Sequence, residues 1–173
     1  MANTYQLIAS NTLSSSAASV TFSSIPATYT DLVLKLSTRT DLADTSVNIF
    51  TRLNGDTATN YSITRVANYG GGVDSDRNTS QVRFNQAPWS EGTNLTANTF
   101  ANSEMYIPSY TASQNKPLSV FDAVENDSAT TAYVIATASL WRNTAAITSI
   151  EMLPYSGNFV SGSSFFLYGI KNS

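Results

Sequence analysis

The chain has 173 residues, with no cysteine, no histidine and a charged fraction of only 12%. The length suits one folded domain, so we expect residues 1–173 to form a single unit. The missing cysteine and histidine remove disulfides, thiolate chemistry and the commonest general base and metal ligand, and the net charge of −3 provides no phosphate-binding patch.

These absences define the expected partners. We expect no cofactor, no metal ion and no nucleic acid, because the residue types that usually bind them are missing or scattered. The N-terminal apolar patch, Leu7 to Ala9, is much shorter than the run of about seven residues that a signal peptide requires. We therefore expect synthesis in the cytoplasm and no insertion into a membrane.

The first half of the chain predicts several short strands. Tyr5 to Ala9 begins the series, and the polar residues Ser10 to Ser19 are expected to form an arm or a loop. Val20 to Phe22 is a short strand, and Leu32 to Ser37 alternates cleanly between apolar and polar residues, which is typical of a strand packed on one side. The same alternation continues from Val47 to Leu53.

Turn signals divide the middle of the chain. Asn54-Gly55 predicts a reversal, after which a strand over Tyr61 to Tyr69 should pair back. The glycines and polar residues from Gly70 to Ser80 predict a mobile loop, followed by a weak strand over Gln81 to Asn85. A second long loop is expected over Pro88 to Asn94.

The second half predicts the remaining strands, over Asn98–Ile107, Leu118–Val124, Ala132–Trp141, Ile147–Leu153 and Ser163–Ile170. One face of the strand over Ala132–Trp141 is rich in alanine, which indicates close approach of a second sheet. The last strand is apolar on both faces, with Phe165 and Leu167 on one side and Phe166 and Tyr168 on the other. We expect it to be central, packed on both sides or covered by a neighbouring subunit.

The fold class follows from the number and spacing of these strands. About ten strands occur at intervals typical of sandwiches and barrels, and no window has an apolar stripe of helical period. The sequence therefore predicts an all-β protein, an antiparallel β-sandwich of the jelly-roll kind.

The acidic residues offer two kinds of candidate site. Asp74, Asp76 and Asn78 place oxygen atoms at alternate positions, as the start of a calcium loop does, but Thr79 stands where such a loop needs glycine. A solvated loop is the favoured interpretation, with a bound cation as the alternative.

Two carboxylate pairs, Asp41 with Asp44 and Glu125 with Asp127, have the residue types that glycoside hydrolysis uses. Both pairs lie in turn-like segments, where acidic side chains commonly cap the backbone. We therefore assign no catalytic residue and predict that the protein is not an enzyme.

The aromatic residues are the remaining candidates, because aromatic side chains dominate both sugar stacking and subunit interfaces. Core burial is the favoured interpretation for Trp141, whereas the loop setting of Trp89 leaves burial and exposure equally open. The residues predicted to contact a ligand or a neighbouring subunit are Trp89, Tyr106, Tyr110, Phe166 and Tyr168.

The two ends of the chain resemble a known group of proteins. The closing run Ser163-Ser164-Phe165-Phe166-Leu167-Tyr168-Gly169-Ile170 is similar to the final strand of many small virion structural proteins of tailed bacteriophages. The opening Tyr5-Gln6-Leu7-Ile8-Ala9-Ser10 and the bend Ile25-Pro26-Ala27-Thr28-Tyr29-Thr30-Asp31-Leu32 are similar to those proteins too. The resemblance implies a β-sandwich of the capsid or tail, present in the virion, released by lysis and trimeric.

Three functions are consistent with these observations. The first is a head decoration or cement protein that binds the major capsid protein as a homo-oligomer. The second is a tail-associated protein or receptor-binding fibre tip, whose loops Gly70 to Ser80 and Pro88 to Asn98 would contact host surface glycans. The third is a lectin-like carbohydrate-binding module or a carbohydrate-active enzyme.

Overall fold

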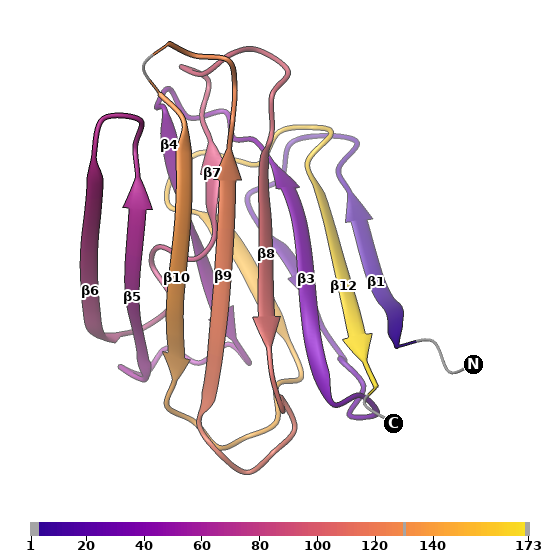
Figure 1. Cartoon of the computed structure of the whole chain (residues 1–173). Helices are drawn as coiled ribbons and strands as arrows, with labels where there is room; N and C mark the ends of the chain where they lie inside the picture. The colour runs from indigo at the N-terminus through magenta and orange to yellow at the C-terminus, as the bar shows by residue number, and fades with distance from the viewer. Residues whose placement is uncertain (1–3, 130, 172–173) are drawn as a thin grey trace.

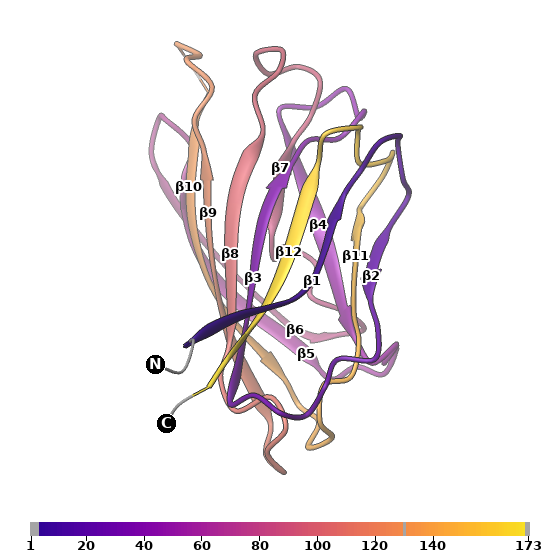
Figure 2. The same cartoon turned by 90° about the vertical axis from the view of Figure 1, so that its right-hand side faces the viewer.

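The computed structural model of the protein describes residues 4–129 and 131–171. In these residues the regular structure is entirely β, and the strands form two antiparallel sheets that face each other (Figures 1 and 2). The prediction of an all-β, jelly-roll-like antiparallel sandwich is confirmed. The described part of the chain contains twelve strands, two more than the approximate count predicted.

The strands in chain order are β1 (Tyr5–Thr12), β2 (Val20–Phe22), β3 (Asp31–Thr38), β4 (Ser46–Leu53), β5 (Tyr61–Asn68), β6 (Val73–Gln81), β7 (Trp89–Glu91), β8 (Ala101–Ile107), β9 (Lys116–Val124), β10 (Tyr133–Trp141), β11 (Ile150–Pro154) and β12 (Ser164–Ile170). The larger sheet has eight strands in the order β1-β12-β3-β8-β9-β10-β5-β6, and the smaller has four in the order β2-β11-β4-β7. Figure 1 looks onto the larger sheet, and Figure 2 shows the two layers side by side.

The core lies between the two sheets and follows from the alternation of side chains along each strand. The leucines of β3 and the inward residues of β12 pack against inward residues of β4 and β11. The largest fully buried side chains of this core are Trp141, Tyr61, Tyr110, Phe84, Phe159 and Phe165. Core burial of Trp141 is therefore confirmed.

The turn at Asn54-Gly55 is present, but it does not make a hairpin. Both residues have positive φ, 54° and 66°, as the sequence signal requires. The turn carries the chain from β4 in the smaller sheet to β5 in the larger one, where β5 pairs with β10 and β6. The prediction that β5 pairs back on β4 is wrong, because alternation marks a strand without marking its sheet.

Two predicted loops contain strands. Most of Gly70–Ser80, predicted to be mobile, is the edge strand β6, and part of Pro88–Asn94 is β7. Of the predicted weak strand over Gln81–Asn85, Gln81 is the last residue of β6, and Phe84 forms a single bridge with Thr51. The sequence signal failed at β6 because most of its side chains on both faces are exposed or half-buried, so no apolar alternation exists to detect.

The polar segment Ser10–Ser19 is held against the sandwich. Its first residues belong to β1, and the rest is a loop in which the backbone N–H of Leu13 donates to Ser163 O at 2.9 Å. Ala17 and Phe159 exchange two further backbone hydrogen bonds. Of the two predictions for this segment, an arm or a loop, the loop matches the structure of the residues after β1.

The terminal strand β12 lies between β1 and β3, as an internal strand of the larger sheet. Phe165 and Leu167 are fully buried on its inner side, whereas Phe166 and Tyr168 are only half-buried on its outer side. The prediction of packing on both sides within the chain is therefore wrong for the outer side. Cover by a neighbouring subunit stays a prediction.

Gly169 provides a test of this packing. A Cβ added there would lie 2.3 Å from the ring of Tyr29, which packs against the core. We expect Gly169→Ala to lower the free energy of unfolding by about 1–3 kcal/mol, because the ring must shift. Urea unfolding measures this change, and Gly71→Ala, where no atom lies within 4 Å of the added Cβ, is the matched control. Equal stability of the two variants would contradict the packing described here.

Candidate functional surface

The outward side chains of the eight-stranded sheet, which we call the outer face, align in rows across the strands. One row consists of Phe166, Lys35, Glu104, Phe121, Ala136, Val66 and Ser75. The next row consists of Tyr168, Val33, Tyr106, Ser119, Ala138, Thr64 and Arg77. The four-stranded sheet covers the opposite side, so no part of the described chain forms a layer over this face (Figure 2).

Large apolar side chains are exposed on the outer face. Phe121 on β9 is 52% exposed, Val134 on β10 is 53% exposed and Val66 on β5 is 47% exposed. Val73 at the start of β6 is more exposed still. Because these residues are neighbours across adjacent strands, they form one continuous apolar surface, of the kind that marks an interaction site.

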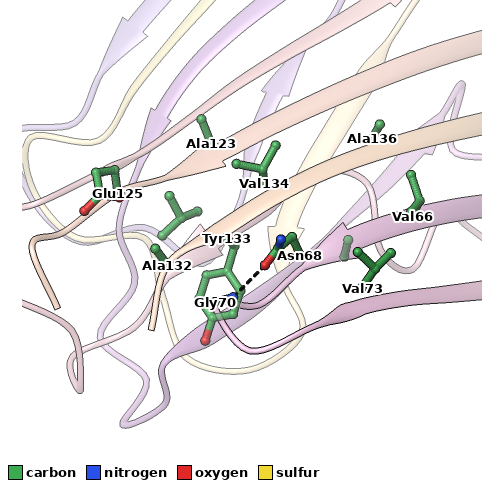
Figure 3. A pocket seen from close by; sticks show the side chains of 12 residues that line it. Val66, Asn68, Gly70, Val73, Ala123, Glu125, Ala132, Tyr133, Val134 and Ala136 are labelled. Carbon is green, nitrogen blue, oxygen red and sulfur yellow. Dashed lines mark hydrogen bonds between the residues drawn. The ribbon is translucent and has the colours of Figure 1, made fainter. Parts of the chain in front are cut away.

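The outer face is hollowed near one end of β5 and β10. The hollow has a volume of about 520 Å³. Figure 3 shows Val66, Val73, Val134 and Ala136 around it, with Asn68 donor and acceptor groups at its edge. The side-chain oxygen of Asn68 accepts a hydrogen bond from the backbone N–H of Gly70 at 2.8 Å, which orders the turn before β6.

A second hollow of about 600 Å³ adjoins the first, and both include Val66 and Ala136. Its floor consists of small side chains on β9 and β10, including Ser119 and Ala138. Phe121 and Tyr106 line it on the side of β8. The face therefore contains a ridge of aromatic side chains beside a depression lined by small ones.

The alanine face of β10 forms part of this depression. Ala136 and Ala138 are exposed, while Ile135, Thr137 and Ser139 point into the sandwich. The prediction that the alanines mark close approach of a second sheet is wrong. The second sheet lies on the other side of β10, where the side chains are larger.

Three of the five predicted contact residues reach the outer face. Tyr106, Phe166 and Tyr168 are half-buried there, on β8 and β12. The Tyr106 hydroxyl donates to Oδ2 of Asp31 at 2.9 Å, and this hydrogen bond raises the pKa of the tyrosine. Tyr168 packs edge-on against Tyr5, with ring centroids 6.3 Å apart.

The other two predicted contact residues are buried, so their assignment to a ligand or subunit contact is wrong. Trp89 lies in β7 and its indole N–H donates to Gln86 O at 3.1 Å. Tyr110 is fully buried, and its hydroxyl donates to the carbonyl of Pro26. Both rings fill the interior, where their polar atoms find backbone partners.

The residues missed by sequence analysis are Phe121, Val66, Val134 and Ala136. A signal existed for the first, because Phe121 alternates with Val120 and Asp122 in a segment recognised as a strand. It was obscured because β9 places an acidic residue, Asp122, inside and a phenylalanine outside. The usual pattern of apolar inward and polar outward residues is reversed at this point.

A buried ion pair lies beneath the end of the sandwich near β7. Nη1 of Arg39 lies 3.2 Å from Oε2 of Glu91, which also accepts a hydrogen bond from the Thr99 hydroxyl at 2.6 Å. The same guanidinium donates to the carbonyls of Leu95, Thr96 and Thr99 at 2.8–3.1 Å. Arg39 therefore fixes the segment between β7 and β8 to the rest of the domain.

Asp122 is buried against β7, the strand that carries Glu91. Its Oδ1 accepts the backbone N–H of Trp89 at 3.1 Å, and its Oδ2 has no hydrogen-bond partner among the described residues. Burial raises the pKa of Asp122 to about 7, against the hydrogen bonds from Ser103 and Trp89, which lower it. Burial raises the pKa of Glu91 as well, although Thr99 and Arg39 oppose the shift.

The acidic residues singled out in the sequence serve the backbone or pair with nearby side chains. Asp41 accepts two hydrogen bonds from Asn158, which lower its pKa, and Glu125 accepts the backbone N–H groups of Asn126 and Asp127. Asp44 accepts the N–H of the residue that follows it.

The comparison of Asp74, Asp76 and Asn78 with a calcium loop is wrong, because these residues lie in the extended strand β6. Asp74 pairs with Arg65 at 2.8 Å, and Asp76 accepts the Asn78 amide at 2.7 Å. Residues 4–129 and 131–171 contain no group of three or more Cys, His, Asp and Glu side chains able to hold a metal ion. The same residues include no helix long and apolar enough to cross a membrane.

Comparisons with known proteins identify no family. No family model matches the chain, and no curated protein matches it significantly. Among solved structures, the chain is similar to galectin LEC-6 from Caenorhabditis elegans, with 12% identity, a TM-score of 0.33, and coverage of 98% of this chain and 96% of that chain. It is also similar to Scytalido-glutamic peptidase with a peptide-based transition state analog, with 10% identity, a TM-score of 0.25, and coverage of 93% and 66% respectively. Likenesses at these scores give no basis for transferring a function.

Asp122 predicts a dependence of stability on pH. Its pKa is about 7 in the folded protein, against 3.8 for the free side chain, so between these limits the folded state holds a proton that the unfolded state releases. Through this group the free energy of unfolding falls as pH rises, by about 2–3 kcal/mol between pH 5 and pH 8.

The comparison with Asp122→Asn isolates this effect, because the amide keeps an oxygen for the Trp89 N–H and does not titrate. Urea unfolding of both proteins at pH 5 and pH 8 measures the two slopes. We expect a steeper loss of stability with pH in the wild type than in the variant. Equal slopes would show that Asp122 does not hold its proton in the folded protein.

Proposed function

We propose that this protein is a non-enzymatic structural component of a bacteriophage virion, and specifically a head decoration or cement protein that binds the capsid shell as a homo-oligomer. The observation that supports this proposal most directly is the outer face. Exposed Phe121, Val134 and Val66 form an apolar surface suited to protein contact, in a chain whose ends resemble virion proteins.

The interior supports a structural role. The buried charged groups hold segments of the sandwich together, as Arg39 does with Glu91 and the backbone between β7 and β8. Lys116 is buried and donates to the carbonyls of Ala112 and Gln114 at 2.6 and 2.5 Å, which ties down the loop before β9. These contacts stabilise a rigid unit that acts through its surface.

We prefer the decoration role to the receptor-binding alternative because of how two segments are folded. That alternative requires accessible loops at Gly70–Ser80 and Pro88–Asn98. Most of the first segment is strand β6, and the second contains the buried residues Trp89 and Leu95 and is held by Arg39. The first segment therefore has few loop residues to offer a glycan, and the second offers the exposed residues 93–94 and 96–98 on a backbone that Arg39 holds in place.

A lectin-like function is the second candidate, favoured by the second hollow of the outer face. Tyr106 and Phe121 line it together with the hydroxyls of Thr64, Ser75 and Ser119, an arrangement able to stack and hydrogen-bond a sugar ring. If this function holds, the protein will bind a glycan array and Tyr106→Ala will abolish the binding. Tyr155→Ala, in the bend after β11, will leave it unchanged.

The location of the chain in an intact particle tests the primary proposal. We expect mass spectrometry of purified virions to detect the chain and cryo-electron microscopy to place it on the outside of the head shell, in regular positions. Density at the tail would support the tail-associated alternative and contradict the decoration role. Absence of the chain from purified virions would contradict both.

A further inference from the structure

We propose that the outer face of the eight-stranded sheet binds a second copy of the same chain, about a two-fold axis that runs parallel to the strands between β9 and β10. This inference deepens the proposed structural role by naming the occupant of the apolar face. It rests on that role only for its biological meaning, because the contact itself is a property of the isolated protein.

The two halves of the outer face carry side chains of different size. The half toward β8 and β9 presents the aromatic side chains of Tyr106 and Phe121, and the half toward β10 and β5 presents the small side chains of Ala136 and Ala138, bordered by Val66 and Val134. A ridge and a matching depression on one face are what a two-fold interface needs, because the same patch must complement itself.

The register of the strands determines which residues would meet across the two-fold axis. In the order β3-β8-β9-β10-β5-β6, the proposed axis exchanges β9 with β10, β8 with β5 and β3 with β6 of the second copy. Phe121 and Ala136 are direct neighbours in one row. The rotation therefore places Phe121 of each copy over Ala136 of the other, inside the depression.

The charged side chains of the outer face lie where the two copies can pair them. On the outward side of the four central strands β8, β9, β10 and β5, Glu104 is the acidic residue, and it lies 2.9 Å from Lys35 on β3. Arg77 lies on β6, in the row next to that of Glu104. Exchange of β8 with β5 and of β3 with β6 places the Lys35–Glu104 pair of each copy over β6 and β5 of the other, beside Arg77, so Glu104 is the acidic group that offsets two cations on each side of the contact.

The area of the outer face is close to that of a stable interface. Six strands spaced ~4.8 Å apart and ~25 Å long cover roughly 700 Å² in plan, before the relief of the side chains is added. A stable interface buries about 800 Å² on each partner. The region from β3 to β6 is therefore large enough for a specific dimer, and its centre is uncharged and apolar, as the core of such an interface requires.

Sedimentation equilibrium or light scattering of the purified full chain tests the inference. We expect a dimer that dissociates on dilution. Phe121→Ser should raise the dissociation constant at least tenfold without changing the melting temperature measured at dilutions where both proteins are monomeric, because Phe121 is half-exposed in the single chain. Tyr155→Ser is the matched control, since this aromatic residue is 45% exposed outside the eight-stranded sheet, and it should leave the dissociation constant within twofold.

Charge reversal tests the direction of the axis. Glu104→Arg and Arg77→Glu should each weaken the dimer severalfold, and the double variant should recover most of the loss. Recovery in the double variant is expected only if the two residues meet across the interface. Two additive losses would contradict the proposed axis.

The remaining outcomes are distinct. A monomer at a concentration of about 100 μM, or a Phe121→Ser protein that dimerises as well as the wild type, would overturn the inference. A trimer, which the virion resemblance implies, would overturn the two-fold arrangement. If the chain dimerises through this face but is absent from virions, the inference stands and the proposed function is contradicted. If the purified chain is monomeric but is found on heads, the inference is contradicted and the location on the head stands.

Discussion

The structure depends on how eight strands are covered by four. Because the smaller sheet has half as many strands, it cannot cover the whole inner surface of the larger one. The segment that continues from β7, the edge strand of the smaller sheet, to β8 completes the cover. Trp89 of β7 and Leu95 of this segment pack with Tyr133, Ile135 and other inward residues of the larger sheet. This segment is not a regular layer, so it needs its own fixation, and Arg39 provides it by binding its carbonyls.

Holding this segment requires charged groups to be buried, which costs electrostatic free energy. A buried guanidinium requires a counter-charge, which Glu91 supplies, and the backbone of Trp89 requires an acceptor, which Asp122 supplies. One oxygen of each carboxyl group has no hydrogen-bond partner among the described residues. Burial raises the pKa of Asp122 and of Glu91 against the contacts that lower it, so closing the sandwich over these carboxyl groups makes its stability sensitive to pH.

The sequence predicted those parts of the fold in which alternation and burial agree. β3 and β4 were recognised because their leucines, valines and isoleucines alternate with more exposed residues, and the apolar run of β12 marked an internal strand. The strand β6 was missed because its side chains contribute nothing to the core. The burial of Trp89 and the exposure of Ala136 were also beyond reach, since a pleated strand shows which residues share a face but not which face turns inward.

That ambiguity bears directly on the outer face. On β9 and β10 the inward positions contain Asp122, Thr137 and Ser139, while Phe121 and Val134 point outward. Folding gains little from these exposed side chains, because burial in the sandwich does not include them. Their stabilising contribution arises only when a second surface removes them from water. In a two-fold contact the same surface of both copies is covered, so one partner is enough. In a heterologous contact, which joins two different surfaces, each new copy would leave a ridge or a depression open and the assembly would continue.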